Sequence, residues 1–185
     1  FGFFRKRMSN ADIDMNMICA SMSDNMSSIL GCETKNHKGS RGFIGSSIPL
    51  GADENRYYAN VDSVGIVLML EGIVFIDDSL QTTMFSSEQS IQDSQVLTRF
   101  AQLYRELGSS ILVHLSGHYN IVLYDKTYET VTVLNDHLGY LPLFIFEDEE
   151  KLVFASKIEA VIASGLSGTH RIDRISVVEQ LLFNY

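Results

Sequence analysis

Apolar residues recur at the spacing of an α-helix in several parts of the chain. Residues 11–29 and 90–108 each carry an apolar stripe at intervals of three and four, the pattern of a helix that packs one face against a core. Residues 174–183 form a final helical pattern. Ser156 is followed three positions later by Glu159, which is the spacing of a capping box. We therefore predict a further helix that opens at Ser156.

Short apolar runs bounded by polar turns predict strands at residues 1–4, 42–50, 64–75, 119–124, 130–134, 143–146 and 152–154. The third run is apolar on both faces, so we expect it to be buried on both sides. The polar stretches at 31–41 and 77–90 are predicted loops. Strands, a helix, more strands and then helices indicate an α+β layered domain with a mostly antiparallel sheet.

Composition and charge narrow the class of protein. The 185 residues fit one domain, and 45% apolar with 20% charged residues is typical of a soluble globular protein. Fourteen basic against 23 acidic residues give a net charge of −9, which disfavours nucleic acid as a partner. No apolar run approaches the roughly 20 residues of a membrane-spanning helix. Cys19 and Cys32 are too few for a disulfide framework and predict buried free thiols in the cytoplasm.

Residue types that commonly carry catalysis are present, but their spacing does not form a catalytic pattern. His114 and His118 have the separation of a helical metal-binding pair, yet Gly117 interrupts a helix between them, so we expect no metal site. Asp77 and Asp78 are adjacent and would point to opposite faces of a strand. The residues by themselves therefore indicate no active site.

Three linked segments carry a much more specific pattern. They read LSGHYNIVLYD at 115–125, NDHLGYLPLF at 135–144 and LVFASKIEA at 152–160. In order and spacing they resemble the glutaminase domain of asparagine synthetases, a class II glutamine amidotransferase domain. That family has approximately L-x-G-x-F-x-x-x-x-x-D, R-D-x-x-G-x-x-P-L-Y and L-x-F-A-S-E-x-K-A. Weaker similarity at 1–2, 70–72 and 92–96 extends the resemblance over nearly the whole chain.

The resemblance implies a fold and a domain organisation. The fold would be the four-layer αββα sandwich of N-terminal-nucleophile hydrolases, with two mainly antiparallel sheets. Residues 1–170 would form the glutaminase-like domain, and 171–185 would begin the linker to an ATP-dependent synthetase domain that this sequence does not contain. That domain would be the partner and would use ATP and Mg, whereas the glutaminase-like domain needs no cofactor. A homodimer is a further option. In this fold we expect nine residues to be substantially buried, namely Val67, Leu68, Leu70, Phe100, Leu103, Ile121, Leu123, Leu134 and Phe154.

The chain departs from the family at the positions that carry the chemistry. The family's N-terminal Cys attacks the glutamine amide, and its own α-amine serves as base. Phe1 stands at that position. The family's oxyanion hole combines an Asn side-chain amide with a Gly N–H. Gly72 is retained, but Glu71 replaces the Asn. The Arg that clamps the substrate carboxylate falls on Gly45 or Ser46.

Asp93 corresponds to the acid that holds the substrate ammonium group, so one of four elements is retained. We therefore expect a degenerate glutaminase-like domain of an asparagine synthetase-type amide-forming enzyme, with a scaffold or docking role. We expect the ring of Phe1, or a neighbour, to fill the former substrate volume, and Glu71 to turn to solvent or to meet Arg41 or a water. Two alternatives stay open: a working amidotransferase whose Cys is missing from this sequence, and a stand-alone protein that binds another ligand in the old pocket.

Overall fold

The computed structural model of the chain describes residues 1–6, 14–27, 31–77 and 96–168, together with Ile175, Val178 and Leu182. One sheet has the strand order β2 (Cys32–Lys38), β3 (Gly42–Pro49), β1 (Gly2–Arg5), β9 (Lys151–Ala155) and β8 (Phe144–Glu147). The other has the order β4 (Tyr58–Val61), β5 (Ile66–Ile76), β6 (Leu115–Asp125) and β7 (Thr130–Asn135). Every recorded strand pair is antiparallel. We call them the first and the second sheet.

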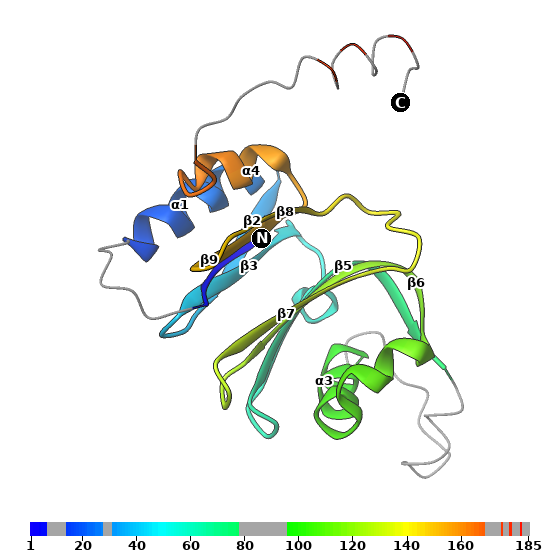
Figure 1. Cartoon of the computed structure of the whole chain (residues 1–185). Coiled ribbons are helices and arrows are strands. Elements are labelled where there is room, and N and C mark those ends of the chain that lie inside the picture. Colours follow the sequence, from blue (N-terminus) through cyan, green and yellow to red (C-terminus); the bar gives the residue numbers. More distant parts are fainter. Residues whose placement is uncertain are drawn as a thin grey trace.

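Helices cover the outer face of each sheet (Figure 1). They are α1 (Met15–Met26) and α4 (Ile158–Ala163) on the first sheet, and α3 (Val96–Leu107) with the 3₁₀ segment η3 (Gly108–His114) on the second. A short 3₁₀ turn, η1 (Glu54–Arg56), precedes β4. The layers therefore follow the order helix, sheet, sheet, helix, and the predicted α+β four-layer sandwich is confirmed.

Strand periodicity distributes the core over the three interfaces between layers. Along β1, Phe3 packs toward α1 and α4, whereas the next residue, Phe4, packs between the two sheets. Along β5, Val67 faces the first sheet and Leu68 faces α3. This alternation follows from the period of two in a strand. Of the nine residues expected in the core, Leu134 alone is only partly buried, and the other eight are buried.

Two predicted features of the fold are wrong. Residues 31–41 contain β2, which pairs along its length with β3, from Cys32 opposite Pro49 to Lys38 opposite Phe43. The strand lies at a sheet edge, so it needs few apolar residues. Its polar sequence therefore lacks the apolar pattern from which strands are predicted. The helix predicted to open at Ser156 begins at Ile158, and Lys157 precedes it without a side-chain cap.

The strand predicted over 64–75 is buried on both faces only along its first part. Residues 66–70 are buried, whereas Ile73 and Phe75 expose 57% and 62% of their surface. The first sheet covers β5 near Val67 and Met69 but leaves this later part open. The loop predicted at 77–90 lies outside the described residues except for Asp77, as do residues 90–95 of the predicted helix.

Most of the predicted helix at 174–183 also lies outside the described part of the chain, although Ile175, Val178 and Leu182 are helical. The division at residue 170 stays a prediction. Among the described residues, no helix is both long and apolar enough to cross a membrane.

A buried ion pair at the end of β6 gives the first testable stability effect. Asp125 accepts hydrogen bonds from Arg105 Nη1 at 2.7 Å and from the N–H groups of Thr127 and Tyr128. Burial raises the pKa of the Asp125 carboxyl, but the Arg105 hydrogen bond and the two backbone N–H groups outweigh burial and hold that pKa below its ordinary value. The folded state therefore stabilises the carboxylate form.

We expect Asp125→Ala to lower the free energy of unfolding by about 2–3 kcal/mol at pH 7, because the substitution leaves Arg105 without its buried partner. Because the pKa of Asp125 is lower in the folded state, its carboxylate stabilises the fold at pH values above the unfolded-state pKa of about 3.9. This stabilisation is lost as the pH falls through the folded-state pKa. The difference between wild type and variant should therefore shrink in urea titrations below pH 4. Asp62→Asn, which removes an ion pair to Lys126 from a side chain that is 82% exposed, should change stability by less than about 0.5 kcal/mol. A difference that does not shrink as the pH falls below 4 would contradict this account.

Candidate active site

Five of the six residues that the family resemblance singled out line one cavity. This cavity has a volume of about 330 Å³, and we call it the cleft. The five residues are Phe1, Gly45, Ser46, Glu71 and Gly72. Asp93 lies outside the described residues. Residues of both sheets form the cleft walls, so the sandwich brings together positions more than 70 residues apart in the chain.

Phe1 is fixed by the ladder between β1 and β3. Gly2 pairs with Ile44, and one position before it the Phe1 α-amine donates to the Gly45 carbonyl at 2.8 Å. The Gly45 N–H in turn donates to the Phe1 carbonyl at 2.7 Å. These two bonds extend the antiparallel pairing to the first residue.

The ring of Phe1 packs among the residues between the first sheet and its helices. It lies edge-on to the Phe43 ring, with 6.3 Å between centroids, and belongs to the cluster that includes Phe3 and Met22. The expectation that this ring closes the cleft is wrong. Period-two alternation gives Phe1 the same face of the sheet as Phe3, and the remaining 330 Å³ falls within the range of small-molecule sites.

Register also distinguishes the two candidate positions for the substrate clamp. Ile44 packs between the sheets, so Ser46, two residues later on β3, shares that face. Residue 45 faces the α1 side, where a β-carbon would overlap Phe1 Cζ and the Asn36 amide oxygen. A side chain that reaches into the cleft from this strand therefore comes from position 46, where the chain has a serine.

Glu71 is held by a chain of side-chain amides that sequence reasoning missed. The amide of Asn120, on β6 opposite Glu71, donates to Glu71 Oε2 at 3.0 Å and to the Pro142 carbonyl at 3.1 Å. The Asn135 amide donates to Asn120 Oδ1 at 2.6 Å and to the Leu141 carbonyl at 3.1 Å. An asparagine within the apolar run of β6 was the signal that could have identified this network, because buried amides need partners.

The electrostatics of the cleft follow from these positions. Glu71 is exposed to solvent, but its carboxylate does not turn away from the cleft as expected, because the Asn120 amide holds it there. The Arg41 guanidinium instead lies over the Phe4 ring, 4.9 Å from its centroid, and donates to the Lys6 carbonyl. Arg41 is therefore not the partner of Glu71. Burial lowers the pKa of the Phe1 α-amine to about 6, although the negative charge of Glu71 opposes this shift.

The described side chains of the cleft do not assemble a nucleophile with a base. Cys32, Ser46, Ser47 and Ser156 line it, yet among the described residues no hydrogen bond joins their thiol or hydroxyl groups to a histidine or carboxylate, and the buried Ser47 hydroxyl has no partner. Nucleophilic catalysis needs a base within hydrogen-bond reach. Within the described parts of the chain, no group of three or more His, Cys, Asp and Glu residues could hold a metal ion.

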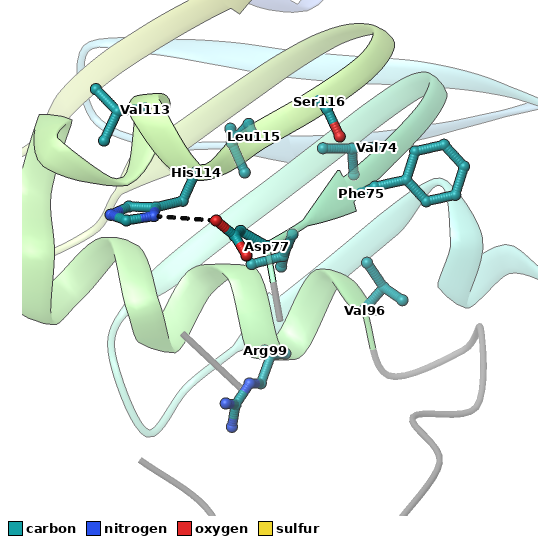
Figure 2. Close-up of a pocket in the computed structure, with 10 residues that line it drawn as sticks. Val74, Phe75, Asp77, Val96, Arg99, Val113, His114, Leu115 and Ser116 are labelled. Carbon is teal, nitrogen blue, oxygen red and sulfur yellow. Dashed lines mark ion pairs between the residues drawn. The ribbon is translucent and has the colours of Figure 1, made fainter. Parts of the chain in front are cut away.

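A second cavity, of about 620 Å³, lies at the far end of β5 and β6 (Figure 2). Its lining includes Asp77 and His114, whose Oδ2 and Nδ1 atoms are 3.9 Å apart, and Arg99 from α3. Figure 2 shows the imidazole directed at the carboxylate, while the guanidinium points away from both. None of the five described site residues that the resemblance singled out lines this cavity.

Comparisons with known proteins agree with the resemblance. The sequence model of a family described as a glutamine amidotransferase domain matches residues 53–163. Asparagine synthetase [glutamine-hydrolyzing] 2 of Bacillus subtilis is 29% identical over 102 residues, which is 53% of this chain and 13% of that protein. Asparagine synthetase B [glutamine-hydrolyzing] of Escherichia coli is 28% identical over 97 residues, 52% of this chain and 17% of that protein. The chain thus corresponds to a small part of the length of these relatives.

Proposed function

The chain belongs to the glutamine amidotransferase domain family, related to asparagine synthetases, and we propose that it no longer hydrolyses glutamine. The observation that carries this proposal is the Glu71 carboxylate on the cleft wall, where the family resemblance expects the oxyanion-binding amide. A carboxylate beside a developing oxyanion raises the energy of the transition state, whereas a neutral amide lowers it.

Two further features support the proposal. Phe1 has no nucleophilic side-chain atom, and its ring packs in the cluster between the first sheet and its helices. Ser46 lies on β3 at the position where the resemblance expects the clamping arginine. It offers a hydroxyl in place of a guanidinium, which binds a carboxylate through two hydrogen bonds. The nucleophile, the oxyanion amide and the clamp are thus replaced together, while the sandwich that would position them is kept.

We expect the purified chain to release no glutamate from glutamine above a mock purification from the same host, measured with a coupled dehydrogenase assay. Phe1→Cys alone should not create activity, since Glu71 and Ser46 remain. Cys32→Ser is the matched control, and its background should equal that of the wild type. Glutamate release that copurifies with the wild-type chain would contradict the proposal and favour a working amidotransferase.

We further propose that the domain is a scaffold that docks on an ATP-dependent synthetase domain of the same protein, in the cytoplasm. Ile73 and Phe75 lie two residues apart on the same face of β5, and His118 pairs with Ile73 across the strands. The Tyr140 ring lies against the His118 ring, with 4.3 Å between centroids and the two planes tilted by 33°. Ile73, Phe75 and Tyr140 are 57–69% exposed. We call Ile73, Phe75, His118 and Tyr140 the β5–β6 strip. Exposed apolar patches of this kind mark interaction surfaces.

Docking through the β5–β6 strip predicts that Phe75→Asp weakens association with a separately expressed synthetase segment at least tenfold. A buried aspartate at an interface costs more than about 1.4 kcal/mol, which corresponds to that factor. Leu50→Asp, at a residue 61% exposed on a turn outside the strip, should leave the affinity unchanged. Equal affinities of wild type and Phe75→Asp in biolayer interferometry would refute docking at the strip. A reading frame without a synthetase segment carrying a Ser-Gly-Gly-x-Asp-Ser loop would refute the scaffold role.

A further inference from the structure

The cleft has the form of a binding site with one fixed charge. Nine of its lining residues have apolar or aromatic side chains: Phe1, Met26, Pro49, Tyr57, Met69, Leu70, Val122, Leu143 and Phe154. The carboxylate of Glu71 stands on the wall contributed by β5. An apolar cavity with a few placed polar groups is the usual form of a small-molecule site.

The amide network fixes this carboxylate before any ligand arrives. Asn120 is 4% exposed, and both of its recorded donations, to Glu71 and to the Pro142 carbonyl, come from the same amide group. The Asn135 amide donates a hydrogen bond to the Asn120 amide oxygen. Glu71 Oε2 is therefore occupied, whereas no described side chain forms a hydrogen bond or ion pair with Oε1. A preorganised acceptor loses little conformational entropy when it binds a ligand.

The cations near the cleft are committed elsewhere. Lys157 Nζ donates to the Met26 carbonyl at 3.3 Å, at the C-terminal end of α1, where a positive charge is stabilised. The Phe1 α-amine donates to the Gly45 carbonyl, and its lowered pKa of about 6 leaves it mostly uncharged at pH 8. None of the ion pairs among the described residues includes Glu71, so its carboxylate has no paired cation there.

We propose that the cleft binds a small organic monoamine, with its ammonium group on Glu71 and an apolar body against Met69, Leu143 and Phe154. This inference rests on the proposed function, because a cleft that still hydrolysed glutamine would be committed to that substrate. An ammonium group supplies the hydrogen-bond donors and the positive charge that Glu71 Oε1 lacks. The apolar walls favour a hydrocarbon or aromatic body over the polar side chain of glutamine.

The test is calorimetric titration at pH 8 with three probes of similar size: 2-phenylethylamine, 2-phenylethanol and 3-phenylpropanoate. An alkylamine has a pKa of about 10, so 2-phenylethylamine is protonated at this pH. It should bind saturably with a dissociation constant of roughly 1 mM or below, within reach of so small a ligand. The alcohol should bind at least tenfold more weakly, and the carboxylate should not bind.

Glu71→Gln should weaken binding of the amine at least tenfold, because it removes the charge and keeps the shape. Glu33→Gln makes the same change at an exposed residue on β2 outside the cleft and should have no effect. Equal binding of amine and alcohol, or an unchanged affinity in Glu71→Gln, would overturn the inference. Failure of the amine to bind, without glutamine hydrolysis, would overturn this inference alone, whereas glutamate release would overturn the proposed function.

Discussion

Gly45→Arg will lower the free energy of unfolding by about 3 kcal/mol or more, because position 45 has no room for a side chain. A β-carbon there overlaps Phe1 Cζ and the Asn36 amide oxygen, and the α1 layer lies beyond them. Overpacking costs about 1–3 kcal/mol, and burial of an unpaired guanidinium adds to that cost. Urea unfolding at pH 7 measures the change.

The matched control is Ser46→Arg, one residue further along β3. Its side chain enters the 330 Å³ cleft, so we expect a loss below about 1 kcal/mol. Phe1→Ala should recover part of the loss in Gly45→Arg, which would appear as non-additivity in the double-mutant cycle. Additive effects would show that the ring of Phe1 does not occupy the space beside Gly45.

Gly72→Ala should lower stability by about 3 kcal/mol, for a reason that concerns backbone rather than catalysis. Gly72 has φ +92°, and a β-carbon there would overlap the His118 carbonyl oxygen across the β5–β6 ladder and crowd Leu141. Gly51 has a similar φ of +79° with nothing within 4 Å. Gly51→Ala should therefore show only the conformational penalty of about 1 kcal/mol.

The contrast between these two glycines bears on how the site is interpreted. Gly72 is the one oxyanion-hole position that the resemblance finds unchanged among the described residues. If Gly72→Ala is much more destabilising than Gly51→Ala in thermal and urea unfolding, the fold alone requires glycine at 72. Its presence is then no sign of retained chemistry. Equal effects would show that the close approach to His118 relaxes at little cost.

Much of the fold could be predicted because local pattern and tertiary structure agree. The stripe of α3 and the alternation along β6 both reflect burial on one or two faces, which apolar spacing records directly. β2 could not be predicted, because an edge strand such as Cys32–Lys38 needs few apolar residues and is specified by its partner β3.

The candidate site was likewise predictable only in part. The resemblance to the glutaminase family predicts that Phe1, Glu71 and Gly72 belong to one site, and the fold places all three on the cleft. The direction of the Phe1 ring and the choice between positions 45 and 46 depend on register between β1 and β3, which sequence spacing does not determine.

The cleft, on this account, belongs to a glutaminase-like domain that has lost its nucleophile, its oxyanion-hole amide and its substrate clamp. The most direct measurement is intact-protein mass spectrometry after incubation with a diazoketone analogue of glutamine, which alkylates an activated nucleophile in a glutamine site. The account predicts that the mass of the native protein is unchanged. A stoichiometric adduct on a cleft residue such as Cys32, prevented by excess glutamine, would contradict it.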